Sequence, residues 1–544
     1  MKKYKISTLA ILAGIILLVS CNNYLKTQLM NQKTSSTYYQ TPSDAMTALT
    51  GCYNGLDLIW NAGIAFPVAS EIFSDNCLGG TGASDNMSYQ ILDAQNNKIM
   101  SINDMFLSNW QAYYQAIYRC NVLIQNEGNV DWASDSATLT KSKCDGEAKF
   151  LRAYLYYDMV RLWGNIPLLT APSSDNLPQA NPDSVYAQII SDLKDAASEL
   201  PAISVTTQPY TGRATKWAAE AMLARVFLFY TGYYGKTDCA GFTKANALAA
   251  VEDVIANSGH RLESNFVSLW PAACVQDSIT GSPVVYAGEN NSEVVFSIKY
   301  TYANSNYNGG VNGNGWLVMM GMRDETHYPF YMGWGACTVD PKLYNAYDAN
   351  DQRRFASIIN VATEVPAFGT SGTGISDQRE YTGYYNKKYT PMCDANGNSL
   401  AVNAGGTNFM ISQYQDYFVM RYADVLLMAA ELGSSNAESY FNQVHTRAGL
   451  SPIGAAPTET QILNERRFEF AFEGIRYWDL LRQGINTAAS TIIANTSTNL
   501  LQDGTSNAAA NFTAQNFILT KGFQQIPQTQ ITLSNGVLKQ NAGW

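Results

Sequence analysis

The stretch that decides the fold is Gln461–Gly484, which reads QILNERRFEFAFEGIRYWDLLRQG. Large apolar side chains recur in it at helical spacing and define one apolar face: Phe468, Phe472, Ile475 and Trp478. Oppositely charged residues stand three positions apart beside that face, as Arg466 with Glu469, Glu473 with Arg476, Arg476 with Asp479, and Asp479 with Arg482. The pattern predicts a buried helix with ion pairs along its sides.

Two carboxylates in this stretch allow a second interpretation. Glu469 and Glu473 lie one helical turn apart, and paired carboxylates can act as acid and base on a glycosidic bond. Each of them also has an arginine within reach, and a neighbouring guanidinium group keeps a carboxyl group ionised. We therefore favour a structural role for both residues and predict no catalytic residue in the chain.

The first residues predict a lipoprotein signal. Three lysines among the first five residues precede an apolar run from Ile6 to Leu18, and Leu18-Val19-Ser20-Cys21 closes it as a bacterial lipobox does. We expect residues 1–20 to be the signal peptide, Cys21 to carry acyl chains such as palmitate, and residues 21–40 to form a tether. Several acyl chains would anchor the protein stably, because each buried methylene contributes about 0.8 kcal/mol. The alternative is an ordinary secretory signal in which the cysteine stands by chance.

Charge and metal-binding residue types exclude several classes of protein. The net charge is -10 and the pI about 5.0, which argues against a nucleic-acid-binding surface. The three histidines, His260, His327 and His445, lie far apart, and the eight cysteines after Cys21 show neither a CxxC pair nor a neighbouring histidine. We predict no metal, no cofactor and no redox motif, and expect most of these cysteines to be small buried side chains.

The rest of the chain is typical of helical hairpins. Thr41-Pro42-Ser43-Asp44 opens one helix, and Gly146 to Trp163 forms a long helix that Gly164 and Pro167 end. Closely spaced alanines from Ala218 to Ala224 would let helices approach each other, and Ala245–Ser258 would form the partner helix. Glu293–Ile298 is a short strand. The predicted fold is mostly α, a tetratricopeptide-like helical-hairpin scaffold with long loop-rich insertions and a few short strands.

Two loop regions interrupt the helical pattern. Residues 60–101 are irregular and rich in Gly, Asn, Asp and Ser, and residues 300–408 interleave Tyr and Trp with glycines. Loops on a rigid scaffold are where binding groups tend to lie. Flat aromatic rings can stack on the apolar face of a sugar while nearby polar groups bind its hydroxyls. Inward packing of the same rings to hold their own loop is the alternative for each of them.

Several motifs together resemble the SusD/RagB family. They are the stretch Gln461–Gly484, the helix GEAKFLRA at 146–153 with GNIPL at 164–168, ALTGCY at 48–53, RYADVLLMAAEL at 421–432, VHTRAGL at 444–450, and IPQ at 526–528 with LKQNAGW at 538–544. The resemblance covers essentially the whole mature chain. It implies helical hairpins over residues 41–290 and a C-terminal region over residues 291–544 that includes the aromatic insertion 300–410.

The resemblance also implies a function. SusD-like proteins are cell-surface lipoproteins of the outer membrane that bind glycans and deliver them to a SusC-like TonB-dependent transporter for polysaccharide utilisation and nutrient uptake. By region, we predict a stacking surface formed by Trp316, Trp334 and Tyr302, with hydrogen bonds from Asp75 and Asn76. Trp60 and Trp270 are the next candidates. A secreted helical glycoside hydrolase and a peptide-binding repeat scaffold are the competing hypotheses, and the identity of the glycan stays open.

Overall fold

The computed structural model describes residues 38–495 and 512–544, except 62, 83, 86, 96–103, 136, 276–281, 304, 307–309, 366–374 and 376–377. The predicted signal peptide, Cys21 and most of the tether lie outside these residues, as does the side chain of Trp60. In the described part of the chain, no helix is long and apolar enough to cross a membrane.

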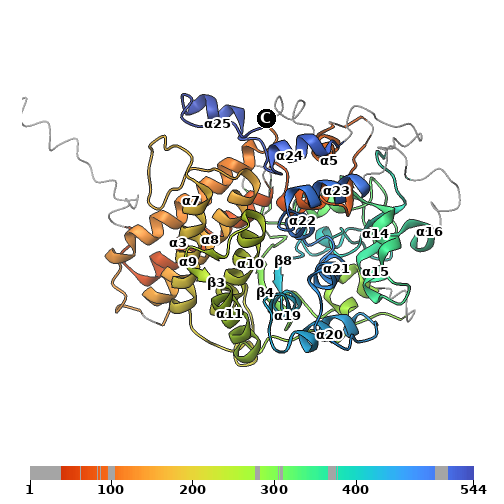
Figure 1. Cartoon of the computed structure of the whole chain (residues 1–544), viewed down its shortest axis with the longest axis horizontal. Helices are drawn as coiled ribbons and strands as arrows, with labels where there is room; N and C mark the ends of the chain where they lie inside the picture. The colour runs from red at the N-terminus through yellow and green to blue at the C-terminus, as the bar shows by residue number, and fades with distance from the viewer. Residues whose placement is uncertain are drawn as a thin grey trace, which may run out of the picture.

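Long helices form the N-terminal half and stand side by side (Figure 1). They are α3 (Pro42–Asn61), α7 (Leu107–Asn126), α8 (Lys141–Trp163), α9 (Pro182–Glu199), α10 (Lys216–Tyr234) and α11 (Lys244–Asn257). Each of these helices packs against the next one along the chain, and α11 then packs against α19 (Tyr422–Glu431) of the C-terminal half. This arrangement confirms the predicted mostly helical, tetratricopeptide-like scaffold.

Polar caps and glycines set the ends of these helices, as the sequence predicts. The Thr140 side chain accepts from the backbone N–H of Lys143 at the start of α8, and Asn181 caps α9 in the same way. Helix α8 ends where Gly164 takes φ +68°, a conformation that glycine adopts without strain. A Cβ at Gly164 would also lie 2.9 Å from the Phe523 ring, so the glycine lets the C-terminal segment pack closely there.

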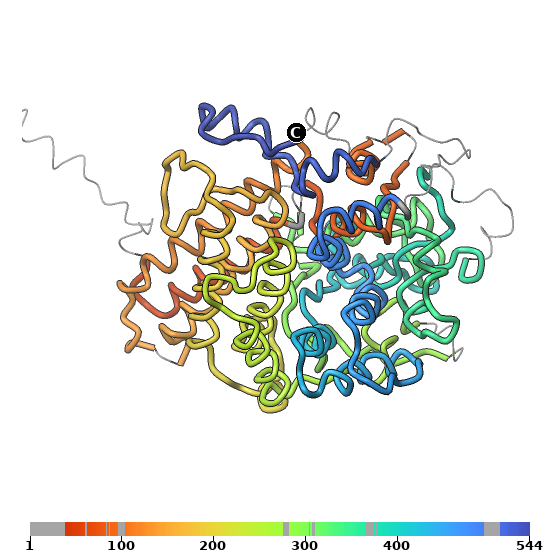
Figure 2. Tube along the Cα trace, viewed as in Figure 1, coloured from red at the N-terminus to blue at the C-terminus, as the bar shows by residue number. Residues whose placement is uncertain are grey.

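The C-terminal half continues the helical packing and carries the aromatic insertion. Its helices are α19, α20 (Ala437–Arg447), α21 (Glu459–Glu469), α22 (Arg476–Leu481), α23 (Ile485–Asn495), α24 (Ala514–Thr520) and α25 (Gln528–Leu533). Figure 2 shows these helices, in blue, beside the green insertion. One hydrophobic core runs through both halves, from Tyr39 to Leu538. Residues 41–290 and 291–544 therefore share a core.

Short elements connect the two halves and build the loops. The strands are β1 (Cys77–Gly79), β2 (Asp238–Cys239), β3 (Phe242–Thr243), β4 (Val294–Ile298), β5 (Cys337–Val339), β6 (Ile358–Asn360), β7 (Tyr384–Asn386) and β8 (Tyr417–Arg421), and they pair antiparallel as β1 with β5, β2 with β3, β4 with β8 and β6 with β7. The short helices are α4 (Phe66–Ile72), α5 (Ser88–Ala94), η1 (Glu127–Asn129), η2 (Phe266–Leu269), α12 (Pro271–Val275), α13 (Leu317–Met320), α14 (Pro341–Ala346), α15 (Gln352–Ser357), α16 (Val361–Glu364) and α18 (Leu400–Asn403).

The stretch Gln461–Gly484 is buried, but the prediction of a single helix is wrong. Helix α21 ends at Glu469 and α22 begins at Arg476. Between them Phe472 has φ +67° and Gly474 has φ +70°, which breaks the right-handed helix. A Cβ at Gly474 would lie 2.8 Å from the Tyr417 hydroxyl, so this turn also needs a residue without a side chain.

The charges of this stretch mostly pair with residues far away along the chain. Of the four predicted local pairs, Asp479 with Arg482 is confirmed at 2.8 Å. The others are replaced by long-range pairs: Arg466 with Asp424 and Asp479, Glu473 with Arg421 and Lys388, and Arg476 with Asp75. The helix break separates Glu473 from Arg476, whereas Arg466 with Glu469 and Arg476 with Asp479 each share one helix but pair with other partners.

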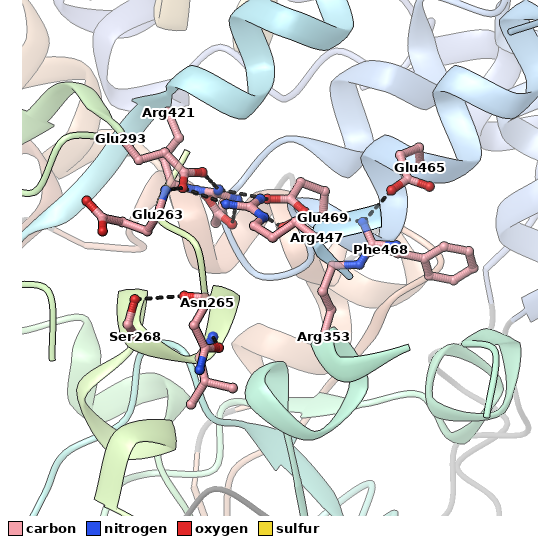
Figure 3. A network of polar contacts seen from close by, with 12 residues as sticks. Glu263, Asn265, Ser268, Glu293, Arg353, Arg421, Arg447, Glu465, Phe468 and Glu469 are labelled. Atoms are coloured by element: carbon pink, nitrogen blue, oxygen red, sulfur yellow. Dashed lines mark hydrogen bonds and ion pairs between the residues drawn. The ribbon is translucent and has the colours of Figure 1, made fainter. Parts of the chain in front are cut away.

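A buried ion network joins this stretch to β4 and β8 (Figure 3). The Arg421 guanidinium group contacts Glu293, Glu469 and Glu473, and Arg447 contacts Glu293 and Glu469. Burial alone would raise the pKa of Glu469, but the neighbouring arginines outweigh it and hold that pKa well below its ordinary value. Each buried charge of the network needs its partner, so the network constrains how the surrounding helices and strands pack together.

The eight cysteines from Cys52 to Cys393 are all buried and unpaired. In the β1–β5 register Cys77 lies opposite Val339 and Cys337 opposite Gly79, and the Cys77 thiol forms a hydrogen bond with the Cys337 thiol. Burial comes first among the causes that raise the pKa of the Cys77 thiol well above its ordinary value, so that thiol stays protonated. This agrees with the interpretation of these cysteines as small apolar side chains.

Candidate functional site

The two loop regions singled out in the sequence lie against each other. Strand β1 pairs with β5, and the ladder continues beyond it, with Gly80 N–H donating to Ala336 O at 2.9 Å and Thr81 N–H donating to Gly335 O at 2.8 Å. A Cβ at Gly80 would lie 2.0 Å from Gly335 O, so glycine is needed for the two backbones to approach. Segments more than 250 residues apart in the sequence therefore form one surface.

A hollow of about 590 Å³ opens where these segments meet. Three segments line it: the early loop, the residues just before α7, and the insertion. The lining residues are Gly63, Ile64, Thr81, Asp85, Ser88, Tyr89, Asp104, Met105, Arg323 and Trp334. We call this space the Trp334 hollow. Its size is that of a small-molecule site, with apolar walls and a few convergent polar groups.

The aromatic rings of the hollow sit on fixed backbone. Trp334 is half-buried, and its backbone N–H donates to the Val318 carbonyl oxygen at 2.8 Å. Tyr89 is half-buried in the first turn of α5, and burial raises the pKa of its phenol. Both rings therefore keep part of their surface exposed while the scaffold holds their position. Such rings can stack on a ligand without a large loss of conformational entropy.

Polar groups lie beside these rings. Arg323 forms ion pairs with Asp85 at 3.0 Å and with Asp324 at 3.2 Å. Asp104 accepts hydrogen bonds from the backbone N–H groups of Gln528 and Thr529 at the start of α25. These contacts hold charged groups in place along the lining of one space, as recognition of a polyhydroxylated ligand requires.

Of the residues predicted to bind a glycan, Trp334 is the one that lines the hollow. Trp316 is fully buried: its ring lies 5.1 Å from that of Tyr389 and 5.5 Å from that of Tyr417, and its Nε1–H donates to the Tyr300 hydroxyl at 3.3 Å. In this structure Trp316 has no ring face open to a ligand, which matches the alternative of inward packing. Trp270, the reserve candidate, is also fully buried.

Asp75 and Asn76 are buried beneath the early loop and have protein partners. The Asp75 carboxylate pairs with Arg476 at 2.7 Å and with Arg467 at 3.0 Å. Burial opposes this ionisation, but Arg476 and Arg467 lower the pKa of Asp75 below its ordinary value. The Asn76 side-chain oxygen accepts from Arg467 Nε at 3.0 Å. Both residues tie the loop to the stretch Gln461–Gly484 in this structure instead of facing the hollow.

Tyr302 belongs to a separate aromatic surface. Its ring is 37% exposed and packs edge to face with Tyr414, which is 40% exposed, at 5.7 Å. Phe409 of the same loop as Tyr414 packs against Tyr331 at 5.1 Å. We call the exposed pair Tyr302 and Tyr414 the Tyr302 surface. The structure therefore separates Tyr302 from the residues that line the Trp334 hollow.

Sequence reasoning missed Asp85, Tyr89 and Arg323. Asp85 and Tyr89 stand in the same polar region as Asp75, and Arg323 stands in the aromatic insertion. The register of β1 against β5 decides which residue of each loop turns toward the hollow. A short irregular strand gives no periodic signal in the sequence from which this register could be predicted.

The alternative catalytic pair has no access to a substrate. Glu469 and Glu473 are 0% and 1% exposed, and arginines and Lys388 occupy their oxygens. Within the described ranges, no three His, Cys, Asp or Glu side chains cluster as a metal site would require. Of the histidines, His445 contacts Glu465 at 2.8 Å, and His260 is buried.

Comparisons with known proteins agree on one family. A model described as "SusD family" matches residues 292–544, and one described as "Starch-binding associating with outer membrane" matches residues 30–228. SusD-like protein P2 of Formosa agariphila is 26% identical over 518 residues, which cover 89% of this chain and 91% of that protein. A SusD-like protein of Bacteroides ovatus is 25% identical over 71% of this chain and 66% of that protein.

Solved structures show the same fold. A laminarin-binding SusD-like protein has a TM-score of 0.72 at 25% identity and covers 93% of this chain and 100% of its own. Surface glycan-binding protein A from Bacteroides thetaiotaomicron has a TM-score of 0.71 at 23% identity, again over 93% of this chain and 100% of its own. With these matches running from residue 30 to the C-terminal residue, the chain belongs to the SusD-like family.

Proposed function

We propose that this protein is a cell-surface glycan-binding lipoprotein that captures oligo- or polysaccharide in the Trp334 hollow. The observation that carries the proposal is the combination in one open space of two half-buried aromatic rings, Trp334 and Tyr89, with the polar pair Asp85 and Arg323. A sugar ring offers an apolar face and a rim of hydroxyl groups, and this lining offers a counterpart to each.

The relatives support the same function. The name of the laminarin-binding SusD-like protein states that it binds a glycan. The description of one matching family model includes starch binding and the outer membrane. Delivery of the glycan to a SusC-like TonB-dependent transporter is part of the proposal, because a binding protein at the outer membrane serves uptake only if a transporter receives its ligand. The Tyr302 surface is proposed as a further contact for a long glycan, since it exposes two more rings.

The proposal is binding without catalysis. The carboxylate pair at helical spacing, Glu469 and Glu473, is buried and ion-paired. No observation favours the hydrolase alternative. Incubation with a polysaccharide panel should give retention of the protein without release of new reducing ends. Release of reducing ends that persists in every preparation of the purified protein would contradict this part of the proposal.

Trp334→Ala tests the site. We expect the variant to lose about 2 kcal/mol of binding free energy, roughly thirtyfold in affinity, because a central aromatic anchor carries much of the energy of such a site. Affinity electrophoresis against the polysaccharide that retains the wild type measures this loss, and a melting curve of the same sample shows that the variant is folded.

Trp132→Ala is the matched control. Trp132 is also a half-buried tryptophan, but it lies after η1, where its Nε1–H donates to Glu127 O at 2.9 Å. This variant should bind like the wild type. If folded Trp334→Ala also binds like the wild type, the Trp334 hollow is not the glycan site.

Cys21→Ala tests the anchor. We expect this variant to leave the membrane fraction, because the lipidated cysteine is the proposed attachment and stable anchoring needs its acyl chains. Fractionation of cells that lack the partner transporter measures the change, since the transporter itself would retain the protein. A Cys21→Ala variant that still sediments with outer membranes in those cells would exclude the lipid anchor.

A further inference from the structure

We infer that the Trp334 hollow selects uncharged glycans over glycans that carry carboxylate or sulfate groups. The inference rests on the proposed function, because it assumes that the hollow binds a glycan. It concerns the electrostatics of the lining, which the family resemblance does not specify, and it follows from the partners of three side chains: Asp85, Asp104 and Arg323.

The lining has an excess of negative charge. Asp85 and Asp104 both line the hollow, and among its described lining residues Arg323 is the one cation. Asp324 and Glu325 follow Arg323 directly in the sequence, and Asp324 is 65% exposed. Burial, followed by the charge of Asp324, raises the pKa of Glu325. An anionic sugar would add another negative charge to this surface.

Arg323 is committed to carboxylates of the protein. Its Nη1 lies 3.0 Å from Asp85 Oδ2, and its Nε lies 3.2 Å from Asp324 Oδ2. Asp85 Oδ2 also accepts the N–H of Gly82 at 2.9 Å, which fixes the carboxylate in place. A uronate or sulfate group could bind Arg323 strongly only by competing with these two carboxylates.

The same groups suit neutral hydroxyls. The Asp85 carboxylate, held in place by Arg323 and the Gly82 N–H, can accept a hydrogen bond from a sugar hydroxyl. Thr81 also lines the hollow, and its buried Oγ1 has no hydrogen-bond partner among the described residues. A hydroxyl group can both donate and accept, so a glycan hydroxyl would satisfy this atom. The lining therefore matches neutral polyols in both charge and hydrogen bonding.

Matched glycans give the test. Laminarin, amylopectin and galactomannan, each with a derivative partly oxidised at C6 to the uronate, are titrated into the full mature protein by calorimetry. For the neutral polymer that binds, we expect oxidation to weaken affinity at least tenfold at low salt. Raising the salt from about 0.05 to 0.5 M should recover part of the affinity for the oxidised form and leave the neutral form unchanged, because salt screens repulsion between charges.

Asp85→Asn separates charge from shape. This variant keeps the side-chain size and removes one negative charge, so the penalty for oxidation should fall at least threefold. Asp131→Asn is the control, since Asp131 is an exposed acid at the far end of α7 and the penalty should stay as in the wild type. A variant that binds no glycan at all would show that Asp85 is an essential hydrogen-bond acceptor, and the salt series on the wild type still decides the inference.

The outcomes distinguish this inference from the proposed function. Equal or tighter binding of an oxidised polymer, weakened by salt, overturns the inference and leaves glycan binding in place. Retention of none of the polymers overturns the proposed function and this inference with it. Preference for a neutral polymer, with a salt-sensitive penalty that Asp85→Asn reduces, supports both.

Discussion

Replacing Arg421 by methionine is expected to lower the free energy of unfolding by about 3 to 5 kcal/mol, because it removes one partner of a buried ion network and leaves the others unpaired. The Arg421 side chain is 1% exposed or less. It contacts Glu469 and Glu473 at 2.8 and 2.7 Å, and its Nη2–H also donates to the Glu469 carbonyl oxygen at 3.0 Å. Methionine fills most of the volume but supplies none of these donors.

Urea denaturation followed by circular dichroism measures this loss. Arg261→Met is the matched control, because Arg261 is exposed and such a surface substitution should change stability by less than about 0.5 kcal/mol. A loss below 1 kcal/mol for Arg421→Met would mean that the carboxylates find other partners. Glycan binding by the folded variant should stay close to that of the wild type, since the network is remote from the residues that line the hollow.

The effect of Arg421→Met should also depend on pH in a defined direction. The folded-state pKa of Glu469 is depressed, so its stabilising contribution is fully present above its unfolded-state pKa near 4.5 and is lost as the pH falls below it. The difference in stability between wild type and Arg421→Met should therefore shrink as the pH is lowered from 7 toward 3. A difference that grows over this range would exclude the assigned ion pairs as its source.

Local sequence patterns predicted the scaffold because helix ends depend on residues close in the chain. The Thr41 cap before Pro42 and the Gly164 stop are both where the sequence places them. The break in Gln461–Gly484 was missed because the Tyr417 hydroxyl that crowds Gly474 comes from another strand. The helical spacing of Phe472 and Ile475 carries no sign of that neighbour.

Of the residues that line the hollow, only Trp334 was predicted by residue, and the others fall in or near regions that the sequence singled out, for the same reason. Composition alone shows that the early loop and the insertion are rich in binding-type residues, and the β1–β5 pair confirms that they meet. Which side chains face outward depends on strand register and on the ion pairs beneath. Asp75 is withdrawn by Arg476, a residue 401 positions away, whereas Asp85 remains beside Arg323 at the opening. No local pattern distinguishes these two aspartates.

Replacing Trp316 by alanine is expected to lower the free energy of unfolding by about 3 to 5 kcal/mol, as is typical when a buried aromatic ring is removed from a packed core. Trp316 is fully buried, and its ring contacts Tyr389 and Tyr417, the second of which lies on β8 next to the ion network. Removing it leaves a cavity between the insertion and the scaffold. Trp316→Phe, which retains an aromatic ring but not the Nε1–H donor to Tyr300, should recover a large part of the loss.

Trp316→Ala and Trp334→Ala should therefore differ in kind. Trp316→Ala should reduce stability and, at a temperature where it is folded, retain most of its glycan affinity, because its ring touches protein on all sides. Trp334→Ala should reduce affinity and retain most of its stability, because Trp334 is only partly buried. Denaturation curves and calorimetric titrations of the two variants, made in parallel on the glycan that binds the wild type, separate these effects. A Trp316→Ala variant with wild-type stability and lost binding would place Trp316 in contact with the ligand and require the insertion to open when a glycan binds.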